Sequence, residues 1–246
     1  MIKAVLFDLD GTLLPMDQEI FTKSYFGRLS ARMAKLGYEP RHFIKTIWEC
    51  TAQMIANDGK KTNGEVFWDG FCRVYGDGAR EHDSELDNFY RTDFQEVKSS
   101  CGYDPAAAET VRELKGRGLR VIVATNPFFP AVATESRIRW AGLEPSEFEL
   151  VTTYENSCYC KPNPDYYREI LQKQGLRAEE CLMVGNDADE DMVAEKLGMK
   201  VFLLTDCLLN KHEKDISAYP QGNFAELLEY VNTLASEQNR HTAVLF

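Results

Sequence analysis

Two aspartates separated by one residue, Asp8 and Asp10, follow a short apolar run near the start of the chain and precede a glycine, Gly11. Side chains alternate along a strand, so these two carboxylates can point to one side just past its end. Each carboxylate raises the proton affinity of the other unless a cation offsets the repulsion. The pair therefore suits chemistry in which one carboxylate attacks as a nucleophile and the other holds a proton for a leaving group.

The same residues also fit an Asx turn followed by a helix cap, which is the commoner outcome for an isolated Asp-x-Asp. Here the motif continues as Asp-x-Asp-Gly-Thr over residues 8–12. At an average frequency of about 5% for each residue type, a chance match to this motif occurs on the order of once per thousand chains of this length. Its position directly after an N-terminal apolar run favours the catalytic interpretation.

Three further polar stretches occur at or after other apolar runs. Thr125 and Asn126 end one run and offer a hydroxyl and an amide that can donate to phosphate oxygens. Lys161 stands beside a proline just before a predicted helix. The last stretch follows a run ending at Val184 and contains Asn186, Asp187, Asp189, Glu190 and Asp191. Taken alone, the first stretch is explained as a turn, the second as a solvated lysine and the third as an acidic helix N-terminus. If the acidic stretch meets Asp8 and Asp10, however, the resulting carboxylate cluster demands a divalent cation.

The elements that must position these residues alternate between strands and helices outside the segment 17–99. Strands are expected at 4–7, 120–125, 148–152, 181–184 and 200–204. Helices are expected at 106–115, 130–140, 164–174, 188–197 and 223–234, with a frayed tail from about Ser236. Short apolar strands separated by helices predict an α/β fold, a Rossmann-like parallel sheet with helices on both faces. Such sheets bind ligands at the carboxyl ends of their strands, where all four motifs fall.

The segment 17–99 contains no convincing strand and predicts about four helices. We expect these at 18–36, 41–57, 64–75 and 84–98, separated by glycine-containing turns. The segment is rich in aromatic residues, most of which should form the core of a helical bundle while the remainder line a pocket. An insertion of this size after the first strand predicts a second domain over the strand ends. The expected division is a catalytic core of residues 1–16 and 100–246 and an all-helical cap of residues 17–99.

Composition limits the partners. The chain has 246 residues, a net charge of −11 and a pI of about 5.0, which argues against a nucleic-acid surface. No apolar stretch approaches the roughly 18 residues of a membrane span, so no membrane partner and a cytoplasmic location are expected. Seven irregularly spaced cysteines fit reduced thiols, and the lone pair Cys158 and Cys160 lacks the ligands of a zinc site. The oligomeric state is left open.

The order of the motifs, from aspartate turn through Thr-Asn and Lys-Pro to the acidic stretch, resembles the haloacid dehalogenase-like superfamily of phosphohydrolases. The resemblance covers roughly residues 2–12 and 101–204. The insertion resembles the helical cap that many members carry after the first strand. By this resemblance Asp8 is the nucleophile that becomes an aspartyl-phosphate, and Asp10 is the general acid and then the base for water. Thr125 and Asn126 match phosphate-binding positions.

The resemblance also implies a metal and a counter-charge. Lys161 matches the lysine that neutralises the nucleophile and the phosphoryl group. Mg²⁺ is expected on Asp8, the main-chain carbonyl of Asp10 and Asp187, together with a phosphate oxygen and waters. Asp191 is the alternative metal ligand, or the group that orients the lysine. Many relatives have Gly-Asp where this chain has Gly185-Asn186, so one negative charge near the metal is missing and the choice of Asp187 over Asp191 stays open.

The implied activity is a Mg²⁺-dependent phosphatase acting on a small phosphorylated metabolite. The superfamily's hydrolytic dehalogenases expel halide without a proton and lack an acid at the position of Asp10, so carbon–halogen cleavage is not expected. A phosphomutase on the same core is the nearest alternative. A phosphonate hydrolase would need a cap lysine forming a Schiff base, for which Lys23 and Lys35 are available. A non-catalytic binding or regulatory module that kept the fold is the alternative from another class.

Overall fold

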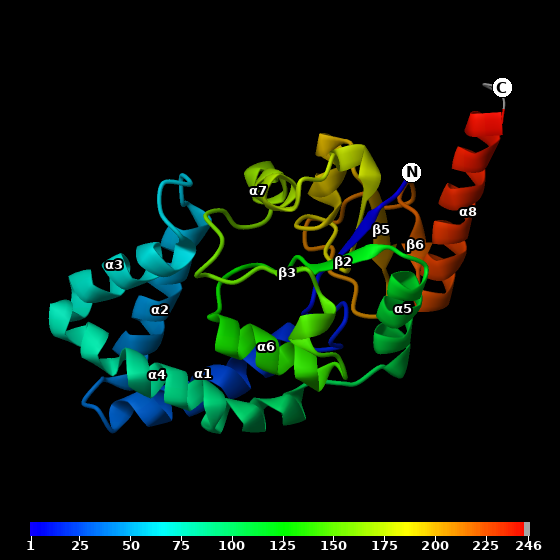
Figure 1. The fold of residues 1–246 in the computed structure, drawn as a ribbon. Coiled ribbons are helices and arrows are strands. Elements are labelled where there is room, and N and C mark those ends of the chain that lie inside the picture. The colour runs from blue at the N-terminus through cyan, green and yellow to red at the C-terminus, as the bar shows by residue number, and fades with distance from the viewer. Residues whose placement is uncertain (244–246) are drawn as a thin grey trace.

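A six-stranded parallel sheet forms the centre of the protein, whose computed structural model describes residues 1–243 (Figure 1). The strand order is β3-β2-β1-β4-β5-β6, and every paired neighbour runs parallel. The strands are β1 Ala4–Phe7, β2 Arg120–Val123, β3 Leu150–Val151, β4 Cys181–Gly185, β5 Lys200–Leu204 and β6 Gln221–Gly222. The predicted α/β fold is confirmed, and the short β6 is a strand that the sequence pattern did not indicate.

Helices cover both faces of the sheet, which explains why its strands are continuous apolar runs. In β1, Val5 and Phe7 face one buried cluster while Ala4 and Leu6 face the other. The first cluster includes residues of α5 Pro105–Gly116, α6 Ala131–Trp140 and α8 Phe224–Ala243. The second includes residues of α7 Pro164–Gln174 and the 3-10 helix η5 Met192–Leu197. Two shorter 3-10 turns, η3 Pro145–Glu147 and η4 Ala178–Glu180, lead into β3 and β4.

Two sequence predictions in this core were wrong. The helix expected at 188–197 forms only as η5, because residues 187–191 fold into a turn in which the Asp187 carboxylate accepts hydrogen bonds from backbone amides. The C-terminal tail does not fray at Ser236, since α8 continues to Ala243. The rest of that predicted tail lies outside the described residues.

The insertion between β1 and β2 is helical, as predicted. Its helices are α1 Gln18–Ala34, α2 Pro40–Ile55, α3 Asn63–Tyr75 and α4 Asp83–Arg91, with 3-10 helices η1 Asp77–His82 and η2 Asp93–Ser100. The fourth predicted helix, 84–98, is interrupted at Thr92, whose backbone leaves the helical region (φ −120°, ψ −87°). Aromatic side chains fill the bundle, including the fully buried Phe43, Phe71 and Phe89.

The chain enters and leaves the insertion at adjacent points. Met16 and Cys101 form an antiparallel bridge, and the Gly102 amide donates to the Pro15 carbonyl at 2.7 Å. In Figure 1 the helices α1 to α4 gather on one side of the sheet, opposite α8. The division into core and cap at residues 16 and 100 stays a prediction. None of the helices within residues 1–243 has the length and apolar character that crossing a membrane requires.

The buried carboxylate of Glu180 links the N-terminal ends of β1 and β4. It accepts from Arg177 at 2.8 Å and from Lys3 at 2.7 Å, and these hydrogen bonds lower its pKa from 4.5 to about 2. A lowered carboxyl pKa stabilises the fold above the unfolded-state value, and that stabilisation is lost as pH falls towards the native value.

We therefore expect Glu180→Gln to lower the free energy of unfolding at pH 7, with a difference from the native protein that shrinks between pH 4.5 and about 2. Urea unfolding followed by circular dichroism across this range measures it. Glu179→Gln is the matched control, because Glu179 pairs with Arg177 on the exposed surface, where such pairs contribute little. A Glu180→Gln difference that does not change with pH contradicts the expectation.

Candidate active site

Asp8 lies directly beyond β1, where the chain makes a tight turn. Its amide donates to the Val184 carbonyl of β4 at 2.9 Å, which fixes the turn between two neighbouring strands. Gly11 adopts φ +88°, and a Cβ at that position would stand 2.4 Å from the side-chain amide of Asn186. Glycine is therefore required here both by backbone conformation and by close packing. The prediction of a sharp turn at Gly11 is confirmed.

Asn186, whose role the sequence left open, holds this turn in place. Its side-chain oxygen accepts from the Thr12 hydroxyl at 2.9 Å, and its amide donates to the Cys207 carbonyl at 2.7 Å. The Thr12 hydroxyl also lies 3.3 Å from one Asp8 carboxylate oxygen. The neutral amide thus links the aspartate turn to the segment after β5.

Lys161 brings together two acidic residues that are 183 positions apart in sequence order. Its ammonium donates to Asp8 Oδ1 at 2.8 Å and to Asp191 Oδ1 at 2.6 Å, and the side chain is 1% exposed. Burial lowers the pKa of the Lys161 amine, but the adjacent Asp191 and Asp8 carboxylates outweigh it and hold the pKa well above its ordinary value. The lysine is therefore a permanent buried cation beside Asp8.

Asp191 shares the lysine from the opposite side. Its second carboxylate oxygen accepts from the Asp187 amide at 2.9 Å. Burial raises the pKa of Asp191, and the lysine opposes this shift. The carboxylate packs so closely on Gly185 that a Cβ there would lie 2.0 Å from it. Asp191 thus occupies the position that suits the predicted orientation of Lys161.

Thr125 ends β2 at the same edge of the sheet. Its carbonyl accepts from the Thr152 hydroxyl at 2.7 Å and the Tyr166 hydroxyl at 2.8 Å, which fixes the backbone. Its own hydroxyl makes no hydrogen bond with the other described residues, and Thr125 lines the same cavity as Asp8. The hydroxyl is therefore available to a ligand.

The Asn126 side chain is already engaged within the protein. Its amide donates to Glu190 at 2.9 Å, and its oxygen accepts from the Lys161 backbone amide at 3.2 Å. These bonds connect the end of β2 to the segment that carries the lysine. Phosphate binding by the Asn126 side chain stays a prediction.

The acidic stretch after β4 does not act as one cluster. Asp187 accepts the amides of Asp189 and Glu190 at 2.7 and 2.9 Å and lines the cavity. Asp189 instead pairs with Lys214 and, at 2.8 Å, with His212. Asp189 is thus held by side chains of the segment after β5, and it is not among the residues that line the cavity.

A buried arginine that the sequence analysis missed contacts the other aspartate of the turn. Arg137 in α6 is fully buried and forms an ion pair with Asp10, while its guanidinium lies 4.3 Å from the ring centroid of Phe129. Burial raises the pKa of Asp10 and the Arg137 charge lowers it, with a net upward shift. A lone arginine in a helix gives no sequence signal for such a contact.

The donor groups at this turn suit a small hard cation. The second carboxylate oxygen of Asp10 is buried and has no hydrogen-bond partner among the described residues. Asp8 and Asp187 follow neighbouring strands and line one cavity. Among the side chains that the structure describes, no group of three or more His, Cys, Asp or Glu is arranged around a possible ion. Mg²⁺ commonly takes only one or two protein carboxylates besides phosphate and water, so this donor set fits it.

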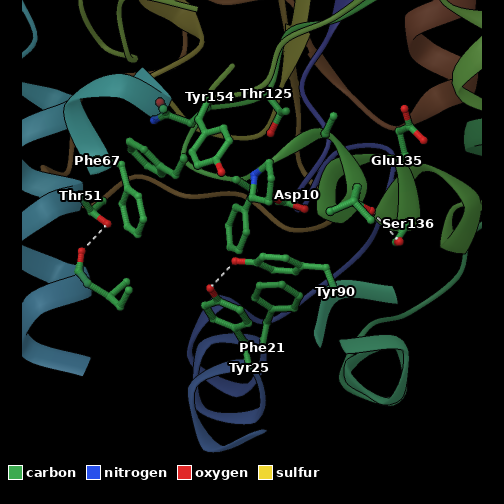
Figure 2. Close-up of a pocket in the computed structure, with 18 of the residues that line it drawn as sticks. Asp10, Phe21, Tyr25, Thr51, Phe67, Tyr90, Thr125, Glu135, Ser136 and Tyr154 are labelled. Atoms are coloured by element: carbon green, nitrogen blue, oxygen red, sulfur yellow. Dashed lines mark hydrogen bonds between the residues drawn. The ribbon is translucent and has the colours of Figure 1, made fainter. Parts of the chain in front are cut away.

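A cavity of about 1670 Å³ extends from these residues into the insertion. Its core side includes Asp8, Asp10 and Thr125, and its other walls come from α1 to α4 and from the residues after β2 and β3. Figure 2 shows Asp10 and Thr125 facing rings that include Phe21, Tyr90 and Tyr154. The site thus has polar residues of the core at one end of the cavity, and the insertion forms an aromatic chamber at the other end.

Comparison with known proteins shows the family of the chain. Residues 2–198 match the haloacid dehalogenase-like hydrolases. The chain belongs to this family. It is 26% identical to the glyceraldehyde 3-phosphate phosphatase of Methanocaldococcus jannaschii, over 96% of this chain and all of the relative.

Two solved structures share the fold of this family member. One is a HAD phosphatase from Thermococcus onnurineus, with TM-score 0.60 and 18% identity over 94% of this chain and 98% of the other. The second is a 2-haloacid dehalogenase from Pseudomonas syringae, with TM-score 0.62 and 20% identity over 95% of this chain and 100% of the other. The fold therefore does not by itself distinguish phosphate from halide chemistry.

We expect Arg137→Met to lower the free energy of unfolding by about 3 kcal/mol, because removing one partner of a buried ion pair leaves the other charge unpaired. Arg139→Met is the matched control on the same helix, since Arg139 is 48% exposed and forms only surface pairs. Urea unfolding at pH 7 measures both. Equal effects of the two substitutions would show that the buried pair contributes nothing to stability.

Proposed function

We propose that the protein is a Mg²⁺-dependent phosphatase that hydrolyses a small-molecule phosphate monoester through an aspartyl-phosphate on Asp8. The observation that carries this proposal is the buried Lys161 ammonium held between Asp8 and Asp191 beside the cavity. It places a hydrogen-bonded cation against the Asp8 carboxylate at the end of a strand, where a nucleophile is needed. The name of the Methanocaldococcus relative is consistent with phosphate-ester substrates.

The first half of the reaction transfers the phosphoryl group to Asp8. A carboxylate oxygen of Asp8 attacks phosphorus while the bond from phosphorus to the ester oxygen breaks. Asp10 gives its proton to that oxygen, so the alcohol leaves neutral. Burial raises the pKa of Asp10, although the Arg137 charge opposes the shift, and this upward shift eases the proton uptake that the step needs.

The second half releases phosphate. Asp10, now a carboxylate, accepts a proton from water, and the water oxygen attacks phosphorus as the bond to Asp8 breaks. Phosphate leaves and Asp8 is again a carboxylate. The spacing of two residues thus separates nucleophilic attack from proton transfer on one short turn.

Charge on the transferring group is met by fixed groups of the chain. Lys161 supplies positive charge at Asp8, and the Thr125 hydroxyl is placed to donate to a phosphate oxygen. Asp8, the Asp10 carbonyl and Asp187 are the groups that would hold Mg²⁺, which when bound neutralises phosphate charge. Both carboxylate oxygens of Asp191 are engaged, one by Lys161 and the other by the Asp187 amide, which favours Asp187 over Asp191 as the second carboxylate for the metal.

Phosphonate hydrolysis loses its support. It would need a cap lysine in the cavity, but Lys23 and Lys35 are exposed, and neither is among the cavity-lining residues. No described contact favours a phosphomutase over a phosphatase. A purely non-catalytic role is at odds with membership of a hydrolase family and with the intact Asp8, Asp10 and Lys161.

The test is phosphate release from a panel of sugar, nucleotide, aryl and alkyl phosphates in Mg²⁺ buffer. We expect turnover of at least one ester that stops when the metal is chelated and returns when Mg²⁺ is restored. Asp8→Asn should reduce turnover by roughly a thousandfold or more, because the amide cannot act as the nucleophile.

The matched control is Asp189→Asn. Asp189 belongs to the same acidic stretch but pairs with Lys214 and not with Lys161. It should keep most of the activity. Circular dichroism checks that both variants fold. Undiminished turnover in folded Asp8→Asn protein would refute the nucleophile assignment, and release that does not depend on a divalent cation would refute the role of Mg²⁺.

A further inference from the structure

The chamber above the aspartates is walled by aromatic side chains. Phe21 and Tyr25 come from α1, Phe67 from α3 and Tyr90 from α4, and all four line the cavity that contains Asp8. Figure 2 shows these rings grouped on the insertion side of Asp10. A leaving group attached to phosphorus at Asp8 would extend into this space, because the same cavity joins the two regions.

Trp48 offers an apolar surface that the protein itself does not cover. It lines the cavity from α2, is 52% exposed, and packs on one side against Phe26 with ring centroids 5.2 Å apart. Large exposed aromatic surface next to a binding site commonly marks a ligand contact. The ring is therefore free to contact an apolar group within the chamber.

The charges of the lining oppose a second anion. Ten carboxylates but only four basic side chains line the cavity. Of these four, Arg91 is paired with Asp87 at 2.7 Å and Arg139 with Glu135 at 3.4 Å. Arg80 lies 4.9 Å over the ring of its neighbour Trp68, and the fourth, Lys211, belongs to the segment after β5 rather than to the insertion.

The buried cations of the site are not available to the leaving group either. Lys161 is held between two carboxylates, and Arg137 is held by Asp10. Neither is among the residues that line the cavity. A carboxylate or second phosphate on the leaving group would thus enter a chamber in which carboxylates outnumber basic side chains. Among the described lining residues of the insertion, Arg80 is the one base without a carboxylate partner, and it is stacked on Trp68. Like charges brought together across a binding site are strongly disfavoured.

We propose that this cavity selects phosphate monoesters whose leaving group is an uncharged alcohol with a ring-sized apolar part, and that it rejects leaving groups with a further negative charge. The inference rests on the proposed phosphatase activity and adds its substrate class. Trp48 is then a specificity-determining contact for the apolar part, while Lys161 and Thr125 serve the phosphate alone.

The experiment compares kcat/KM for ethyl phosphate, 2-phenylethyl phosphate and 2-(4-carboxyphenyl)ethyl phosphate in Mg²⁺ buffer. The two methylenes insulate the ester oxygen from the ring substituent, so reactivity is nearly constant and binding decides the order. We expect the phenylethyl ester to exceed the ethyl ester, and to exceed its carboxylated form by roughly tenfold or more. A carboxylated ester as good as the phenylethyl ester, or an ethyl ester as good, overturns the inference while the phosphatase stands.

Trp48→Ala should lower kcat/KM for the phenylethyl ester by roughly threefold or more and leave the ethyl ester unchanged, since only the ring contact is removed. Ile55→Ala is the matched control, because Ile55 is similarly exposed on the same helix but does not line the cavity. Equal values for the phenylethyl ester in both variants would overturn the role of Trp48. Absence of phosphate release from all three esters and from the wider panel would instead refute the phosphatase.

Discussion

The buried ammonium of Lys161 between Asp8 and Asp191 is the interaction on which the site depends. Two carboxylates at the ends of adjacent strands repel each other, and a buried pair would take up a proton without a cation. The lysine offsets that repulsion with hydrogen bonds of 2.8 and 2.6 Å. Because breaking such a triad leaves an unpaired buried charge, the protein must hold every member in place.

Much of the surrounding structure serves this requirement. The register of β1 on β4 places Phe7 opposite Val184. The turn that carries Asp8 and the turn that carries Asp187 therefore begin side by side. Gly185 leaves room for the Asp191 carboxylate, and Asn126 fixes the backbone of the lysine. The parallel sheet therefore brings together residues distant in sequence, and the insertion closes a chamber over them.

The sequence predicted the elements whose pattern is local. Continuous apolar runs indicated the core strands, and motif order indicated that Asp8, Thr125 and Lys161 belong to one edge of a sheet. It did not reveal Arg137, because a helical arginine looks the same whether it faces solvent or a buried aspartate. The break at Thr92 and the replacement of a helix at 188–191 by a turn were also missed, since both depend on tertiary hydrogen bonds.

Identifying the residue that is phosphorylated during turnover tests the role of Asp8 as the nucleophile. The protein is mixed with excess hydrolysable ester and Mg²⁺, quenched rapidly in acid, and digested for mass spectrometry under conditions that preserve acyl phosphates. We expect a phosphoryl group on Asp8 that is absent from the Asp8→Asn protein. Rapid release of phosphate with no phosphorylated Asp8, or with phosphorylation confined to another residue, would contradict it.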